Sequence, residues 1–167
     1  MEKIDILKRT DIFYDLTTAQ LEMMASLCEE RAIKLGELVF EENSMGDEMF
    51  VIARGSVEVL VDPSIVGGPT AKKRGSGPVT IATLRAGQTF GEVALVDQGS
   101  RTASARCAEM ETQLLVIHRG KFNKLCDTYP ELGYRVMRNI AADLSFKIRG
   151  SDLAIREQLL WRPRQTG

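Results

Sequence analysis

A stretch of sixteen residues near the middle of the chain, 90–105, combines side chains that suit a small phosphate ester. It reads Phe-Gly-Glu-Val-Ala-Leu-Val-Asp-Gln-Gly-Ser-Arg-Thr-Ala-Ser-Ala. Gly91 lets the backbone approach a ligand closely because glycine has no Cβ, and Glu92 adds a carboxylate. Arg101 carries a planar guanidinium, which pairs with two phosphate oxygens at once. A carboxylate that can accept from sugar hydroxyls, beside an arginine, indicates a nucleotide with few phosphates.

The residues after Glu92 predict a short apolar helical turn. Amides at the start of a helix lack partners within the helix and, together with the helix dipole, attract anions. We therefore expect the amides of Val93–Leu95 to assist Arg101 in an anion site. The alternative is a glycine turn in which Glu92 and Arg101 only pair with each other on the surface, which would stabilise little.

Two stretches resemble the cyclic-nucleotide-binding domain family. Phe-Gly-Glu-Val-Ala-Leu, a polar gap and Arg-Thr-Ala resemble its phosphate-binding cassette. Residues 42–59, with Gly46 and Gly55 at turns, resemble the signature of its early strands. The resemblance covers about Ile12 to Leu125. It implies an α+β fold: an antiparallel β-roll, or double-stranded jelly roll, with N-terminal helices and a long C-terminal helical segment.

The resemblance also implies a role for each cassette residue. Arg101 would bind the exocyclic phosphate oxygens, and the amides of Ala94 and Thr102 would complete the anion shell. Glu92 would accept a hydrogen bond from the ribose 2′-hydroxyl. The implied ligand-binding residues are Gly91, Glu92, Val93, Ala94, Leu95, Arg101, Thr102, Ala103 and, for contact with the base, Ile81. The implied ligand is cAMP or cGMP, with no cofactor and no metal.

The sequence leaves the base of the ligand open. In the family, a threonine directly after the arginine is associated with cGMP, yet bacterial-type members bind cAMP with a hydroxyl residue there. Thr102 is also a residue that strands favour. Lys147 and Ile148 stand where the family has base-contacting hydroxyl residues. Trp161 could stack on the purine as a lid, or it could be a core or interface tryptophan.

The segments around the cassette predict the scaffold. Thr17 and Gln20 form a capping-box pattern at the start of a helix. The apolar period then changes to two, and short strands with glycine turns favour a sandwich or jelly roll. Strands are expected at 31–35, 38–41, 49–53, 56–61, 79–84, 102–108 and 113–117. The Gly/Pro/Ser-rich segment 62–78 is longer than a usual hairpin loop and reads as an insertion.

Two helices are expected after the roll, separated at Tyr129-Pro130 because a proline disfavours helix at the preceding residue. Apolar residues of the second recur at Leu132, Val136, Ile140, Leu144 and Ile148, a stripe that could pack on the roll, on a second copy or on both. We predict a homodimer through 136–148, and a helix stop at 150–152. The expected division is 1–128, the roll with its flanking helices, and 129–167, a helical hinge, dimerisation surface or lid of the same domain.

Composition narrows the environment and the partners. The chain has 167 residues, 44% hydrophobic residues and a net charge of −1, so no global field attracts nucleic acid or an anionic membrane. No apolar run approaches the roughly 20 residues that cross a bilayer, and the N-terminus lacks a signal-peptide pattern. The three cysteines show no C-x-x-C pair. We expect a cytoplasmic protein with reduced thiols.

We therefore expect a non-enzymatic receptor that binds a cyclic nucleotide and signals through its C-terminal helices to a partner that the sequence does not name. The alternative is the effector-binding part of a catabolite-activator-type transcription factor cut before its DNA-binding domain, since few residues follow Trp161. A metal-dependent cupin enzyme is disfavoured because His118 is the one histidine. The sequence shows no nucleophile–base pair and no P-loop, so we do not expect an enzyme. A redox or haem sensor is disfavoured because no cluster of cysteines precedes the roll.

Overall fold

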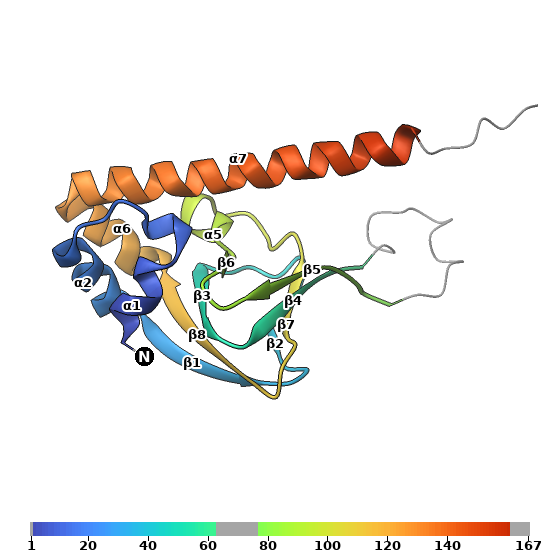
Figure 1. Ribbon diagram of the computed structural model, residues 1–167, viewed down its shortest axis with the longest axis horizontal. Coiled ribbons are helices and arrows are strands. Elements are labelled where there is room, and N and C mark those ends of the chain that lie inside the picture. The colour runs from blue at the N-terminus through green and yellow to red at the C-terminus, as the bar shows by residue number, and fades with distance from the viewer. Residues whose placement is uncertain (1, 63–76, 161–167) are drawn as a thin grey trace, which may run out of the picture.

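The computed structural model describes residues 2–62 and 77–160. Helices α1, α2 and α6 gather at one end of a β-roll, and α7 runs along its side (Figure 1). The helical elements are α1 (Lys3–Lys8), η1 (Asp11–Phe13), α2 (Thr18–Leu27), α5 (Val93–Val96), α6 (Arg119–Thr128) and α7 (Pro130–Leu160). The strands are β1 (Glu29–Lys34), β2 (Leu38–Phe40), β3 (Glu48–Arg54), β4 (Ser56–Val61), β5 (Val79–Arg85), β6 (Thr89–Phe90), β7 (Ser104–Cys107) and β8 (Glu111–His118).

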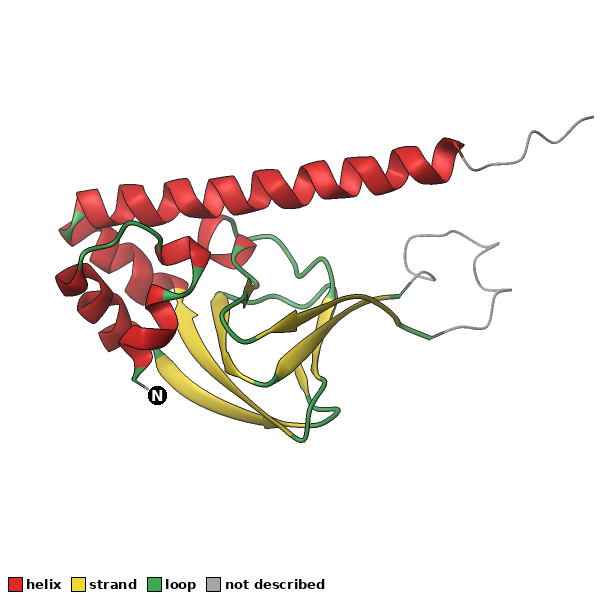
Figure 2. Cartoon of the chain, viewed as in Figure 1, coloured by secondary structure: helices red, strands yellow, loops and turns green. Residues whose placement is uncertain are grey.

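The strands form two four-stranded antiparallel sheets, with orders β1-β8-β3-β6 and β2-β7-β4-β5. Figure 2 shows the strands as one twisted roll with the helices outside it. The predicted antiparallel β-roll is therefore confirmed. Each of the seven predicted strands has a counterpart within a few residues. Strand β6 was not predicted, because two residues are too short to display an alternating pattern.

Two hydrophobic clusters form the core. One fills the roll, where the rings of Phe50 and Phe90 stack with centroids 5.0 Å apart. The other joins the helical end to the roll and includes Met24, Phe122 and Val136. The site segment 90–103 lies at the boundary between them, because Phe90 belongs to the first cluster and Leu95 to the second.

Two local signals for helix ends are confirmed. The Thr17 side chain accepts from the Gln20 amide and the Gln20 side chain accepts from the Thr17 amide, which is the predicted capping box. Helix α6 ends at Thr128 and α7 begins at Pro130, as the Tyr129-Pro130 pair predicted.

The predicted helix stop at residues 150–152 is wrong, because α7 is one continuous helix through Gly150 to Leu160. An interior glycine costs about 1 kcal/mol relative to alanine, which a long helix can absorb when no proline follows. Ser151 donates to the carbonyl of Lys147, 3.1 Å away, so its hydroxyl is used within the helix and does not cap a new one.

The apolar stripe of α7 divides into two parts. Leu132, Val136 and Ile140 are buried in this chain's own core, and Leu144 packs partly against them. Ile148 is 62% exposed. The first part of the stripe therefore packs on the domain itself and offers no surface to a second copy.

Two features of the sequence lie outside the described residues: most of the segment 62–78, and Trp161 with its suggested lid. Among the helices that are described, none is both long and apolar enough to cross a membrane.

Candidate ligand-binding site

A cavity of about 700 Å³ opens between the roll and the inner face of α7. Its walls come from β4, β5, the segment 90–103 and the distal half of α7. The predicted site residues that line it are Ile81, Gly91, Glu92, Val93, Ala94, Arg101, Thr102 and Ala103. Leu95 does not line it, because its side chain is buried in the core cluster beneath the helices. The fold thus gathers all but one of the predicted residues around one space.

The guanidinium of Arg101 lies inside the protein, with 7% of the residue exposed. Its Nη2 donates to the carbonyl of Glu48 at 2.8 Å, and its Nη1 donates to the carbonyl of Gly91 at 3.3 Å. Its Cζ lies 4.2 Å from the centroid of the Phe40 ring, so the cation also packs on an aromatic face. Its buried Nε has no hydrogen-bond partner among the described residues. Two of the five N–H donors bind these carbonyls, and the Nε donor is among those left for a ligand.

Nearby carboxylates help Arg101 to keep its positive charge in a buried position. Desolvation lowers the pKa of this guanidinium, while the charges of Glu48, Asp47 and Glu92 raise it. An arginine is protonated at all physiological pH values, so the site keeps a cation at its inner end.

Two glycines make room for this arginine. A Cβ on Gly46 would stand 2.6 Å from Nη2 of Arg101, and a Cβ on Gly91 would stand 2.8 Å from its Nη1. Gly91 also has a positive φ of 72°, which side chains of L-residues rarely adopt. The sequence assigned Gly46 to a turn, and the structure shows that a Cβ there would meet the cavity-lining Arg101.

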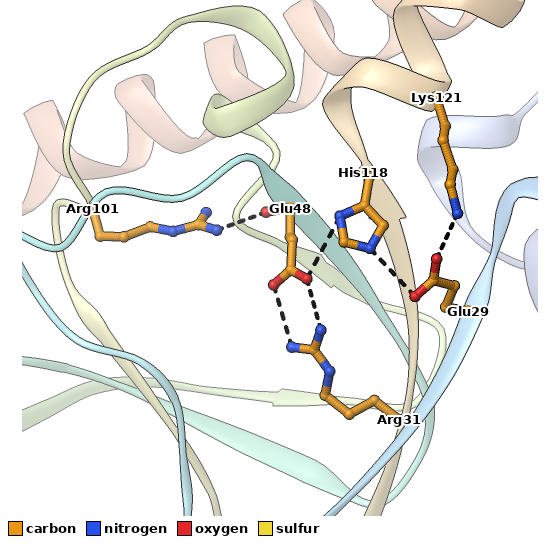
Figure 3. A network of polar contacts seen from close by, with 6 residues as sticks. All are labelled: Glu29, Arg31, Glu48, Arg101, His118 and Lys121. Atoms are coloured by element: carbon orange, nitrogen blue, oxygen red, sulfur yellow. Dashed lines mark hydrogen bonds and ion pairs between the residues drawn. The ribbon is translucent and has the colours of Figure 1, made fainter.

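A polar network holds the carbonyl that Arg101 contacts. Figure 3 shows its members: Glu29, Arg31, Glu48, Arg101, His118 and Lys121. The Glu48 carboxylate accepts from both terminal nitrogens of Arg31 at 2.7 and 3.2 Å. His118 lies between two carboxylates, with Nδ1 3.7 Å from Glu48 and Nε2 3.4 Å from Glu29. Strands β1, β3 and β8 thus converge behind the arginine and fix its position.

Glu92 is the second buried charge on the cavity, and 4% of the residue is exposed. Its Oε1 accepts from Nζ of Lys147 at 2.6 Å, and its buried Oε2 has no hydrogen-bond partner among the described residues. A surface ion pair between Glu92 and Arg101 is not what the structure contains, because both side chains are buried and Glu92 pairs with Lys147.

The amides of the short helix α5 are less available than predicted. The Ala94 amide donates to the carbonyl of Gly91 at 3.1 Å, and the Leu95 amide donates to that of Glu92 at 3.0 Å. These bonds span three residues and close the turn tightly, so they use donors that the sequence suggested were free. The cationic side of the site therefore depends chiefly on Arg101.

Helix α7 supplies Lys147, which the resemblance placed at a base-contact position, and three residues that the sequence did not assign to the site. Lys147, Gly150, Ser151 and Ala154 line the cavity, whereas the exposed Ile148 does not. Their spacing of about one helical turn places them on one face, so the signal was present in the sequence. The predicted stop at Gly150 hid it. Phe40 was missed as well, because nothing local relates a phenylalanine in β2 to an arginine beyond α5.

A β-roll with a buried arginine and a buried carboxylate on one cavity suits a small anionic ligand, and the comparisons with known proteins identify the family of the fold. The model of the cyclic nucleotide-binding domain matches residues 30–129. The chain is 28% identical over 149 residues to the Cyclic AMP receptor protein of Thermus thermophilus, covering 89% of this chain and 62% of that protein. It is 30% identical over 135 residues to a cGMP-dependent protein kinase of Drosophila melanogaster, covering 80% of this chain and 14% of the kinase.

Solved structures show the same fold. The catabolite activator protein of Thermus thermophilus superposes with a TM-score of 0.74 at 27% identity, covering 89% of this chain and 63% of that one. A cyclic nucleotide-binding domain from Methylobacillus flagellatus superposes with a TM-score of 0.77 at 24% identity, covering 94% and 82%. The chain belongs to the cyclic nucleotide-binding domain family, whose domain is regulatory and non-catalytic.

Proposed function

We propose that this chain is a non-enzymatic receptor that binds cAMP or cGMP in the cavity between the roll and α7. One observation carries the proposal: Arg101 and Glu92 are both buried on that cavity, and each keeps a polar atom without a partner among the described residues. Buried polar groups without partners are costly. A ligand that brings an anion and a hydroxyl group to the same cavity would satisfy both.

The proposed roles follow from residue type and position. Arg101 binds the exocyclic phosphate oxygens, and Glu92 accepts a hydrogen bond from the ribose 2′-hydroxyl. Gly91 lets the backbone approach the sugar, and the Thr102 amide adds a donor to the phosphate. Ile81, on the exposed strand β5, contacts the base. Cavities that hold small ligands span about 300–1,000 Å³, which suits a cyclic mononucleotide here.

We expect the choice of base to depend on the Thr102 side chain and on the residues of α7 that line the cavity. A cyclic AMP receptor and a cGMP-dependent kinase are both among the relatives, so both nucleotides belong in the test. Nucleotide binding would bias α7, and a ligand shifts such an element only by its differential affinity for the two arrangements.

The proposed organisation has residues 1–128 as the receptor roll and 129–167 as the helical segment that carries the signal, in a cytoplasmic protein without membrane contact. A homodimer would use the exposed apolar side chains of α7, Met137, Ile148 and Ile155, which recur at a spacing close to whole helical turns. The proposal gives this chain no DNA contact of its own, and its downstream protein partner is not identified.

A second candidate is the effector-binding part of a catabolite-activator-type transcription factor. The observation that favours it is that the chain spans 62% of the length of the Cyclic AMP receptor protein that it matches. The length of the native open reading frame separates the two candidates, because the second requires a DNA-binding domain after α7.

Calorimetric titration of the chain with cAMP, cGMP and 5′-AMP tests the main proposal. At least one cyclic nucleotide should bind with one ligand per chain, and 5′-AMP should bind more weakly because its phosphate is a dianion outside a ring. Absence of heat and of competition with both cyclic nucleotides would contradict the proposal.

A further inference from the structure

We propose that Lys147 is a positioning residue for Glu92: from helix α7, it holds one oxygen of that carboxylate and orients the other to receive a ligand hydroxyl. The distal half of α7 would then be part of the binding site and not only its cover. This inference rests on the proposed function, because it concerns the same cavity. It goes beyond that function by naming the contact through which α7 affects affinity.

The contact is short and constrained at both ends. Nζ of Lys147 lies 2.6 Å from Oε1 of Glu92 and 2.8 Å from Oδ2 of Asp143. Asp143 stands one helical turn before Lys147, so the ammonium is held between a carboxylate of its own helix and one of the roll. The Glu92 side chain is 6% exposed and that of Lys147 is 43% exposed, so the carboxylate is the buried partner and the ammonium is partly in contact with solvent.

A cation at one oxygen of the Glu92 carboxylate orients the whole group. The ammonium of Lys147 contacts Oε1, which limits rotation of the carboxylate and leaves Oε2 facing away from the pair. Hydrogen bonds to an ionised acceptor are stronger than those to a neutral one. Lys147 therefore positions Glu92 so that a ligand hydroxyl can donate to it.

The pair leaves room for the ligand. A carboxylate offers about four acceptor sites, and the Lys147 ammonium occupies one of them at Oε1. Oε2 has no hydrogen-bond partner among the described residues. A hydroxyl can thus bind Glu92 together with Lys147, and it does not have to displace the ammonium.

The same contact ties the distal half of α7 to the roll. The first turns of α7 are held by Arg135, which binds Asp15, and by Asn139, which donates to the carbonyls of Ile12 and Tyr14. Further along the helix, Lys147 makes a polar contact with the roll through Glu92. Because Gly150 and Ser151 line the cavity just beyond it, this contact sets how closely α7 approaches the ligand.

The test compares two ligands and three variants of the full chain by calorimetry. The ligands are the cyclic nucleotide that the wild type binds more tightly and its 2′-deoxy analogue. The variants are Lys147→Met, Lys147→Arg and, as a matched control, Arg149→Met, which changes an exposed cation on the same helix. A thermal melt of each variant confirms that it folds.

We expect Lys147→Met to weaken binding of the ribonucleotide about tenfold, since part of a charge-assisted hydrogen bond is lost. The 2′-deoxy analogue should bind this variant and the wild type equally, because it makes no bond to Glu92. Lys147→Arg should restore most of the affinity, and Arg149→Met should leave both affinities unchanged.

Three results would overturn the inference. Tighter ribonucleotide binding by Lys147→Met would mean that Lys147 competes with the ligand. An equal loss for both ligands would mean that Lys147 acts on the phosphate or the base. Unchanged affinities would mean that it is a surface pair without function. Failure of the wild type to bind any cyclic nucleotide would instead refute the proposed function, so the two failures are distinguishable.

Discussion

A Cβ atom on Gly46 would stand 2.6 Å from Nη2 of Arg101, although one residue precedes β3 and the other follows α5. The turn before β3 therefore packs directly against the guanidinium of Arg101. Gly46→Ala should push the guanidinium toward the cavity and weaken its bond to the Glu48 carbonyl, which is 2.8 Å long in the structure. We expect the affinity of this variant for a cyclic nucleotide to fall about tenfold.

Titration calorimetry measures this effect, and Gly120→Ala is the matched control because a Cβ at Gly120 meets no atom within 4 Å. The control should bind like the wild type. Equal affinity of Gly46→Ala and the wild type would show that the guanidinium does not need the observed position.

The buried thiol of Cys28 should make the folded protein less stable at alkaline pH. Burial raises the pKa of this thiol from 9.0 to about 12, although Lys3 lowers it slightly. Between these pH values the unfolded chain loses the thiol proton and the folded chain keeps it. The stabilisation is fully present below pH 9.0 and falls as the pH rises, by at most about 1.4 kcal/mol per pH unit. Urea unfolding of the wild type and of Cys28→Ala across this range measures the slope, which should be shallower in the variant. Equal slopes would contradict the assignment.

The two parts of the α7 stripe should respond differently to substitution. Ile140 is 1% exposed, so Ile140→Ala should lower the free energy of unfolding by about 2–5 kcal/mol. Ile148 is exposed, so Ile148→Glu should leave the stability of the monomer almost unchanged and should dissociate the proposed dimer. Light scattering and denaturant unfolding measure the two effects. A wild type that is monomeric at micromolar concentration would refute the dimer.

The contribution of Lys147 should not vary with pH in the neutral range. Burial lowers the pKa of this ammonium, but Glu92 and Asp143 together outweigh burial, and the net shift is upward. A raised pKa keeps the Lys147 ammonium charged at every pH below the ordinary lysine value of about 10.4. The ratio of wild-type to Lys147→Met affinity should therefore be constant from about pH 6 to about pH 9. A ratio that falls toward the alkaline end would show that Lys147 deprotonates in that range.

The roll and most of the site could be predicted because their signals are local. Short apolar runs mark β3 and β8, alternation marks much of β4, and the spacing from Gly91 to Arg101 marks the cassette. The cavity gathers the cassette residues except Leu95. Local pattern is sufficient here because each strand is short and several turns contain a glycine.

The remaining parts depend on tertiary contacts that a single sequence does not display. The carbonyl partners of Arg101 come from Glu48 and Gly91, and their backbone directions follow from strand pairing. Glu92 and Lys147 meet because α7 packs along the roll, and Ser151 and Ala154 line the cavity because the helix continues past Gly150. A glycine followed by serine and aspartate is a typical helix end, and only the length and packing of α7 decide against it.

The bond between Arg101 and the phosphate is the central claim, and calorimetry with cAMP and cGMP on the wild type and on Arg101→Ala tests it most directly. The wild type should bind at least one of the two nucleotides. Arg101→Ala should lose on the order of 2–5 kcal/mol of binding free energy, because it removes one partner of a buried charge pair. Equal affinity of the two proteins, or no binding by the wild type, would contradict the account.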